Sequence, residues 1–211
     1  MKFLEPTLLK SIRVPFLLII LMYLLKTLEI VLNSNYFVWG ILPRTVLGLR
    51  GILFSPFIHS DSLHLLSNTI PFLVLLTLIF YFYKRIAVRI LIFSFLLEGI
   101  LVWLFARNSY HIGASGLVYA FFGFIAISGL IRRQIPLLSI SLLIIFLYGG
   151  LVWGVLPQEK HISWESHLFG LLVGLVLAIY YKAYKMEHFN NSKITDDEEY
   201  KTEFWNDLIE E

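Results

Sequence analysis

Four polar residues lie within long apolar stretches of the sequence and have the side chains of a hydrolytic site. They are His64, Asn68, Ser115 and His167. A serine hydroxyl becomes an effective nucleophile when an adjacent base removes its proton, and imidazole or amide N–H groups can stabilise an oxyanion. Polar residues are expensive inside membrane spans and mark function there by default. Together these residue types indicate nucleophilic hydrolysis.

Ser115 lies in the segment Gly113-Ala114-Ser115-Gly116. The flanking glycines remove side-chain bulk and permit unusual backbone angles, so the hydroxyl is accessible. The N–H of Ser115 itself can point at a developing oxyanion. Taken alone the segment is weak support, because small residues are common where membrane helices touch.

His167 is followed by Gly170 and Gly174, which form a small-residue stripe on one helix face. Such a stripe brings a membrane helix close to its neighbour. If that neighbour is the glycine-rich helix that starts near Ser115, the imidazole comes within hydrogen-bonding range of the hydroxyl. In isolation, a histidine that merely hydrogen-bonds at a helix contact is an equally good interpretation.

His64 and Asn68 are four residues apart, so they share one helical face. Both can donate hydrogen bonds to an oxyanion. A metal site is disfavoured, even with His59 and Asp61 nearby, because asparagine is a weak ligand and no carboxylate or second histidine follows at helical spacing. We therefore predict no metal and no cofactor.

The composition is that of a membrane protein. Of 211 residues, 58% are hydrophobic and 15% are charged, whereas an average soluble domain has roughly 25% charged residues. The formal net charge of +2 and the absence of a basic cluster interleaved with aromatics argue against a nucleic-acid partner. The chain has no cysteine, which excludes disulfides and thiolate chemistry.

Six apolar runs are long enough to be membrane-spanning helices, which need about 20 residues. Solid runs of this kind exclude a β-barrel, whose strands alternate. The long connection at 33–62 is rich in large apolar residues but is broken by glycine and proline, so it is predicted to be an interfacial loop. The predicted spans are Val14–Leu32, Leu63–Phe82, Ile86–Phe105, Gly113–Ile131, Ile135–Leu156 and Ser166–Tyr184.

The distribution of lysine and arginine predicts that both termini are cytoplasmic. The cytoplasmic side would hold Lys2, Lys10, Arg13, Lys84, Arg85, Arg89, Arg132, Arg133, Lys182 and Lys185, and the outer side only Arg44, Arg50, Arg107 and Lys160. With this topology the second, fourth and sixth spans all descend from the outer surface. His64, Asn68, Ser115 and His167 therefore lie in one layer, because each residue of helix adds about 1.5 Å of depth.

Three motifs resemble the rhomboid family of intramembrane serine proteases. "GASGLVYAFFG" (113–123) resembles the fourth helix of the family, "HSDSLHLLSN" (59–68) its H-x4-H-x3-N pattern, and "HLFGLLVG" (167–174) its H-x2-G-x3-G pattern. The order, spacing and helix count agree with the six-helix bacterial form. The resemblance implies an all-α membrane protein: a six-transmembrane-helix bundle with the interfacial loop between helices 1 and 2.

The resemblance also implies the roles of the site residues. Ser115 would attack the peptide and His167 would act as general base and then as general acid. His64, Asn68 and the Ser115 N–H would hold the oxyanion, and Tyr119 would pack against His167 and orient it. The family uses a dyad, so no acidic third member is expected.

Two buried or nearby carboxylates are assigned no catalytic role. Glu98 lies in the middle of the third predicted span, where a bare carboxylate is costly, and is expected to be hydrogen-bonded and structural. Glu165, beside His167, is assigned to the preceding loop. The chain is divided into a protease domain at 1–185 and an acidic cytoplasmic tail at 186–211.

The function predicted from these observations is an intramembrane serine endopeptidase of the bacterial inner membrane. Its partners would be transmembrane proteins, cleaved near their extracytoplasmic ends, and the lipid bilayer, with the oligomeric state left open. A non-catalytic rhomboid-like binder of transmembrane helices is the main alternative. A small transporter is a third, which the outer position of the polar cluster disfavours, since transporter sites lie near the bilayer midplane.

Overall fold

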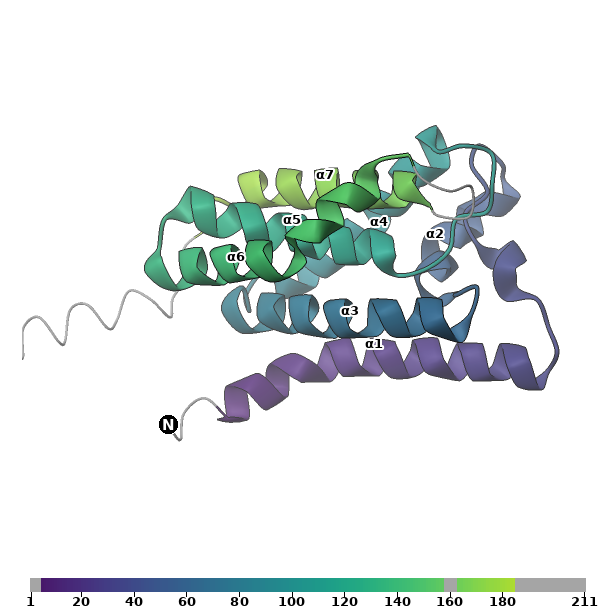
Figure 1. Ribbon diagram of the computed structural model, residues 1–211, viewed down its shortest axis with the longest axis horizontal. Coiled ribbons are helices and arrows are strands. Elements are labelled where there is room, and N and C mark those ends of the chain that lie inside the picture. The colour runs from purple at the N-terminus through teal and green to yellow at the C-terminus, as the bar shows by residue number, and fades with distance from the viewer. Residues whose placement is uncertain (1–4, 158–162, 185–211) are drawn as a thin grey trace, which may run out of the picture.

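The computed structural model describes residues 5–157 and 163–184, which form helices joined by turns and loops. The tail predicted at 186–211 lies outside the described residues. Within them the only β-type pairing is an isolated bridge between Ile41 and His111. Figure 1 shows the long helices running side by side. They are α1 (Glu5–Val31), α3 (Ser62–Phe82), α4 (Ala87–Phe105), α5 (Ser115–Arg132), α6 (Ile135–Tyr148) and α7 (Trp164–Tyr180), with the short α2 (Gly51–Phe54) between α1 and α3.

Five of the described helical segments are long and apolar enough to cross a membrane. The sixth apolar helix, α7, has 17 residues, which corresponds to roughly 25 Å at about 1.5 Å per residue. The hydrocarbon core is about 30 Å thick. The prediction of an all-α membrane protein is confirmed, and five of the six predicted spans correspond to helices of sufficient length. The segments that meet the criterion are Leu8–Val31, Ser62–Phe82, Ala87–Phe105, Ser115–Arg132 and Ile135–Val155.

Helix α5 is the central helix of the bundle. In its most apolar stretch 72% of the residues are buried, against 17% in α1 and in the α6 segment. It packs most extensively against α7 and also contacts α3, α4 and α6. Figure 1 shows α1 lying along the outer side of α3, at the edge of the bundle. The residues that begin α5 are therefore surrounded by other helices.

The cytoplasmic ends predicted for α5 and α7 are joined by Arg132. Its Nε donates to Ser128 Oγ at 3.1 Å, and its Nη1 donates to the Tyr184 carbonyl at 2.7 Å. Its Nη2 donates to the Tyr181 carbonyl. These carbonyls follow the last turn of α7, where helix carbonyl groups lack intrahelical donors. A cation in this position also complements the negative end of the helix dipole.

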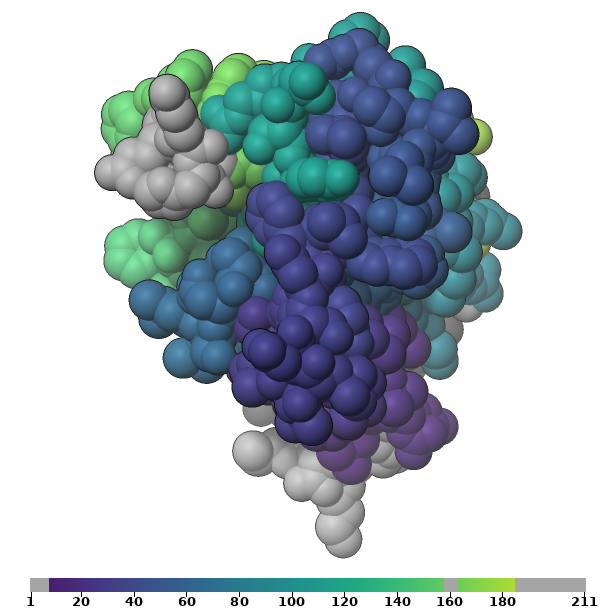
Figure 2. Space-filling model, turned by 90° about the vertical axis from the view of Figure 1, so that its right-hand side faces the viewer, coloured from purple at the N-terminus to yellow at the C-terminus, as the bar shows by residue number. Residues whose placement is uncertain are grey.

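The connection between α1 and α3 folds into short helical turns. They are the 3₁₀ segments η1 (Tyr36–Trp39), η2 (Leu47–Arg50) and η3 (Ser55–Phe57), together with α2. Many of its apolar side chains are exposed, most of all Val46 at 87%, whereas Ile41 and Ile58 are buried. In Figure 2, which shows the end of the molecule where this connection lies, its indigo residues cover much of the face. An exposed apolar surface of this kind is compatible with the predicted interfacial position.

The arginines of this connection have structural partners that the sequence did not predict. Arg44 donates to the carbonyls of Leu104 and Ala106, at 3.3 and 2.7 Å, and so satisfies the end of α4. Arg50 lies over the Trp39 ring at 4.2 Å and donates to the Val38 carbonyl at 2.9 Å. Arg44 thus links the connection to α4, and Arg50 stabilises contacts within the connection.

Several helix boundaries differ from the predicted spans, and those of α5 and α6 have clear local reasons. Helix α6 ends at Tyr148, where Gly149 and Gly150 follow, and the chain continues as the 3₁₀ segment η4 (Gly149–Val155). Helix α5 begins at Ser115 rather than at Gly113, because Gly113 has a φ of +102°, outside the helical region. The predicted nucleophile is therefore the first residue of its helix.

Candidate active site

Helices α5 and α7 approach each other at backbone distance through the predicted small-residue stripe. A Cβ added to Gly170 would collide with the carbonyl oxygen of Gly116, and one added to Gly174 would collide with that of Ala120. Only glycine permits such an approach at these two positions. The neighbour of α7 is thus the glycine-containing helix that begins at Ser115.

This packing brings Ser115 and His167 together from positions 52 residues apart. The His167 Nε2 lies 2.9 Å from Ser115 Oγ. The other ring nitrogen, Nδ1, lies 2.9 Å from the carbonyl oxygen of Gly154 in η4. A carbonyl only accepts, so Nδ1 carries the proton and Nε2 presents its lone pair to the serine hydroxyl. This is the tautomer that a general base requires.

Tyr119 fixes the plane of the imidazole. It lies four residues after Ser115 on α5, and its ring stacks on His167 with centroids 4.3 Å apart and planes 5° apart. A Cβ on Gly154 would collide with the Tyr119 hydroxyl and would lie 3.3 Å from His167 Nδ1. The ring of His167 is therefore held on one face by Tyr119 and at its edge by the Gly154 carbonyl.

His64 faces the segment that precedes the serine. A Cβ on Gly113 would lie 2.8 Å from His64 Cε1 and 2.9 Å from its Nε2, so the ring packs directly on the Gly113 backbone. Asn68, one turn further along α3, is buried, and its amide donates to the His64 carbonyl at 2.9 Å. A primary amide carries two N–H groups, so one donor of Asn68 remains beyond this bond.

The residues before Ser115 are held in place by two backbone hydrogen bonds. Gly113 N–H donates to the Ser55 carbonyl at 2.9 Å, and Ala114 N–H donates to His59 Nε2 at 3.4 Å. The N–H of Ser115 then belongs to the first helical turn, whose amides have no intrahelical acceptor. The backbone thus presents free donors and the positive end of a helix dipole beside the hydroxyl.

His59 is a buried structural partner of the site that the sequence analysis did not assign. It is 2% exposed, and burial lowers the pKa of its imidazole to about 3. The ring is therefore neutral near pH 7 and can accept the Ala114 N–H. The signal that pointed to it is its place as the first histidine of the H-x4-H-x3-N pattern.

A second histidine, His111, connects the loop between α4 and α5 to the start of α7. Its Nδ1 lies 2.5 Å from Ser163 Oγ, and Ser163 Oγ lies 2.8 Å from Ser166 Oγ. Its Nε2 lies 3.1 Å from the Arg107 carbonyl, so Nε2 donates and Nδ1 accepts. Burial lowers the pKa of the His111 imidazole. The sequence analysis did not identify this residue.

The two carboxylates near the site both have structural partners. Glu98 is buried, lies against Gly116, and is hydrogen-bonded by the Ser166 side chain. Glu165 is 3.5 Å from Arg107. The assignment of Glu165 to a loop is wrong, because α7 begins at Trp164 and Glu165 lies in its first turn. An acidic residue is favourable there because the helix N-terminus carries partial positive charge.

Metal ligation has little basis in the described part of the chain. Among residues 5–157 and 163–184, no group of three or more His, Asp or Glu side chains is placed to hold a metal ion.

The described fold is a bundle of apolar helices in which Ser115 and His167 are in contact near the first turns of α5 and α7. The Rhomboid domain family model matches residues 46–184. The chain belongs to the rhomboid family.

Several mycobacterial proteins are similar to this chain. An uncharacterized protein of Mycobacterium tuberculosis is 34% identical over 167 residues, which cover 75% of this chain and 70% of the relative. An uncharacterized protein of Mycobacterium bovis matches with the same identity and coverage. One of Mycobacterium leprae is 34% identical over 140 residues, 62% of this chain and 55% of the relative.

Proposed function

We propose that this protein is an intramembrane serine endopeptidase that cleaves transmembrane helices of other membrane proteins near their extracytoplasmic ends. The observation that carries the proposal is the 2.9 Å contact between His167 Nε2 and Ser115 Oγ, with the His167 Nδ1 proton engaged by the Gly154 carbonyl. Membership of the rhomboid family supports the same activity.

In the proposed reaction Ser115 Oγ attacks the carbonyl carbon of the scissile peptide bond and His167 Nε2 takes the hydroxyl proton. The oxyanion receives hydrogen bonds from the Ser115 N–H, His64 and Asn68. His167 then passes its proton to the leaving amine, and the C–N bond breaks to leave an acyl ester on Ser115. Water, deprotonated by His167, attacks this ester and releases the acid and the free serine.

The remaining site residues support this chemistry through position. Tyr119 keeps the imidazole in the plane in which Nε2 meets the hydroxyl. Gly113 lets the His64 ring, and Gly116 the Glu98 carboxyl, pack on the backbone beside the nucleophile, and Gly170 and Gly174 let α7 approach α5. A substrate peptide bond must be freed from its own helical hydrogen bonds before it can reach Ser115. We therefore expect preference for helix-destabilising segments rich in small residues.

The proposed topology has six crossings, with α7 as the sixth despite its 17 residues. α7 packs against α5 and α4, and a short hydrophobic helix can be accommodated by local thinning of the bilayer. The lysine and arginine distribution supports a topology in a bacterial inner membrane with both termini on the cytoplasmic side. The protease domain comprises residues 1–185, and residues 186–211 form an acidic cytoplasmic tail.

The test is cleavage of a model transmembrane substrate by the purified full chain in bilayers. Ser115→Ala and His167→Ala should each abolish cleavage, because either change removes one member of the nucleophile–base pair. Ser128→Ala, at the opposite end of α5, is the matched control and should retain cleavage. Full activity of Ser115→Ala would refute the proposed nucleophile.

The same assay distinguishes the proposed enzyme from a non-catalytic binder of transmembrane helices. A binder would hold a transmembrane segment equally well with or without the Ser115 hydroxyl and would release no fragments. An enzyme yields two fragments whose junction identifies the scissile bond. Fragment production by the wild-type chain, lost in Ser115→Ala, therefore excludes the binder.

A further inference from the structure

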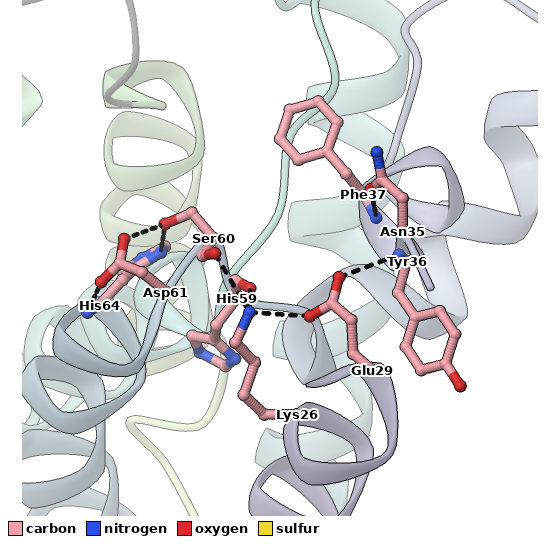
Figure 3. A network of polar contacts seen from close by, with 9 residues as sticks. All are labelled: Lys26, Glu29, Asn35, Tyr36, Phe37, His59, Ser60, Asp61 and His64. Carbon is pink, nitrogen blue, oxygen red and sulfur yellow. Dashed lines mark hydrogen bonds and ion pairs between the residues drawn. The ribbon is translucent and has the colours of Figure 1, made fainter. Parts of the chain in front are cut away.

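A network of polar contacts joins the outer end of α1 to His64, the first residue of the site along the chain. Lys26 on α1 donates to the carbonyls of His59 and Ser60, at 3.0 and 3.1 Å. Lys26 is also paired with Glu29 at 2.8 Å. Figure 3 shows these side chains meeting at the turn that precedes α3, with Ser60 and Asp61 beside the His64 ring. The turn is thus fixed from the α1 side.

Asp61 holds two hydrogen bonds with its two oxygens. Its Oδ1 accepts from the His64 backbone N–H at 2.8 Å, as the N-cap of α3. Its Oδ2 lies 2.7 Å from Ser60 Oγ. The bond from the His64 N–H, together with the one from the Ser60 hydroxyl, lowers the pKa of the exposed Asp61 carboxyl. The carboxylate is ionised near pH 7 and can only accept.

The direction of the hydrogen bond between Ser60 and His64 follows from the two bonds that Asp61 accepts. Ser60 Oγ has one proton, and the ionised Asp61 Oδ2 takes it. Ser60 Oγ also lies 3.2 Å from His64 Nδ1, and with its proton already donated it can only accept there. His64 Nδ1 must therefore carry a proton. In the neutral ring this leaves Nε2, the atom that packs on Gly113, without one.

We propose that Asp61 and Ser60 form a relay that keeps the proton of neutral His64 on Nδ1, so that His64 donates a hydrogen bond toward the reacting centre only as the imidazolium. Ser60 and Asp61 are then positioning residues that act through His64. The inference rests on the proposed function only where it gives His64 an oxyanion to stabilise. The relay itself is a property of the turn.

Other charged and titratable groups also face His64. The His59 ring, which is buried, lies edge-on with centroids 5.1 Å apart. From α7, His167 is close enough to interact electrostatically. Lys26 acts from α1. Burial of the ring and the charge of Lys26 both oppose a positive charge on His64, whereas the Asp61 carboxylate favours one.

The decisive variant is Asp61→Asn, because it reverses the relay without removing the helix cap. Asparagine and aspartate cap helices about equally well. Capping requires the asparagine oxygen to face the His64 N–H, which puts the amide NH₂ where Oδ2 faces Ser60. The amide then donates to Ser60 Oγ, and the hydroxyl proton turns to His64 Nδ1. The ring proton moves to Nε2, and neutral His64 becomes a donor.

The first measurement is ¹⁵N NMR of histidine-labelled full-length protein in bilayers, with His64 assigned by its absence in His64→Gln. We expect neutral His64 to be protonated at Nδ1 in the wild type and at Nε2 in Asp61→Asn. Ser60→Ala, which keeps the Asp61 cap, should also lose the Nδ1 preference. Ser67→Ala is the matched control, because its hydroxyl donates to the His64 backbone carbonyl at 2.9 Å and not to the ring.

The second measurement is the dependence of substrate cleavage on pH. The wild-type rate of substrate cleavage should fall by about 100-fold as rising pH converts the His64 imidazolium to the neutral ring. Removal of one oxyanion donor costs about that much. The Asp61→Asn rate should not show this fall, because its neutral His64 still donates from Nε2. Wild-type His64 protonated at Nε2, or the same tautomer in wild type and Asp61→Asn, would overturn the relay. If no variant cleaves substrate, the proposed function fails, whereas the NMR result still decides the relay.

Discussion

Gly170 of α7 packs directly on the Gly116 backbone of α5, so Gly170→Ala is the most informative packing variant. The new Cβ would collide with the Gly116 carbonyl oxygen and lie 3.3 Å from Gly116 Cα. Carbon and carbonyl oxygen normally approach no closer than about 3.3 Å, so α7 must move away from α5 by about 1 Å. This displacement would act on a Ser115 Oγ to His167 Nε2 contact of 2.9 Å.

The expected effect on catalysis follows from that displacement. Lengthening the contact by about 1 Å takes it beyond the range of a hydrogen bond. A misplacement of about 1 Å costs on the order of 100-fold in rate. We therefore expect kcat/KM for a transmembrane substrate to fall by about 100-fold in Gly170→Ala. Overpacking should also lower the free energy of unfolding by about 1–3 kcal/mol.

The control is Gly149→Ala, because a Cβ at Gly149 meets no atom within 4 Å. Gly149 also has a φ of −57°, which alanine adopts readily. Initial rates of substrate cleavage and thermal unfolding should be measured for both variants in the same bilayers. Cleavage by folded Gly170→Ala within a few-fold of the Gly149→Ala rate would refute the claim that the α5–α7 contact sets the distance between Ser115 and His167.

Two further predictions concern stability. Arg132→Gln should lower the free energy of unfolding by about 1.5–3 kcal/mol, because the carbonyls after α7 lose their charged donor. The control is Arg133→Gln, which changes an exposed neighbour. Equal melting temperatures of the two variants would contradict the prediction. Burial lowers the pKa of His59 from 6.5 to about 3, so the unfolded chain binds more protons between these values and stability should fall as pH is lowered from 7 toward 4. His59→Gln should show a shallower loss of melting temperature over that range, and an unchanged slope would show that His59 is not the responsible group.

Apolar runs and the charged breaks between them were enough to predict five of the long helices, because a membrane span must satisfy its backbone internally and so must be helical. The ends of the runs were less predictable. The start of α1 at Glu5 precedes the predicted Val14, since polar residues such as Lys10 and Arg13 continue the helix beyond the apolar run. The end of α6 depends on the tighter turns of η4, which hydropathy does not detect.

The stripe of Gly170 and Gly174 predicted a close neighbour for α7, and the common depth of Ser115 and His167 suggested which neighbour it was. Hydrogen bonds between distant segments were not predictable in this way. His111 meets Ser163 across 52 positions, and His59 meets Ala114 across 55. Neither pair has a spacing that a local pattern reveals. Their partners depend on how the connection at 33–62 folds over the end of α4.

The role of Arg44 was missed for a related reason. It was expected on the outer side from the count of charged residues, and nothing in its local sequence indicates that it satisfies the carbonyls of Leu104 and Ala106. Its positive φ of 57° shows that the backbone turns sharply at this residue. Such a conformation is uncommon for a residue other than glycine, and the sequence alone does not predict it.

The most direct test of the central claim is labelling of the folded full-length protein in bilayers with a serine-directed fluorophosphonate, followed by peptide mass spectrometry. A hydroxyl activated by His167 should be phosphonylated at Ser115, and the adduct should be lost in Ser115→Ala and reduced to background in His167→Ala. Absence of the adduct from Ser115 in folded wild-type protein, or equal labelling of Ser115 in His167→Ala, would contradict the proposed nucleophile–base pair.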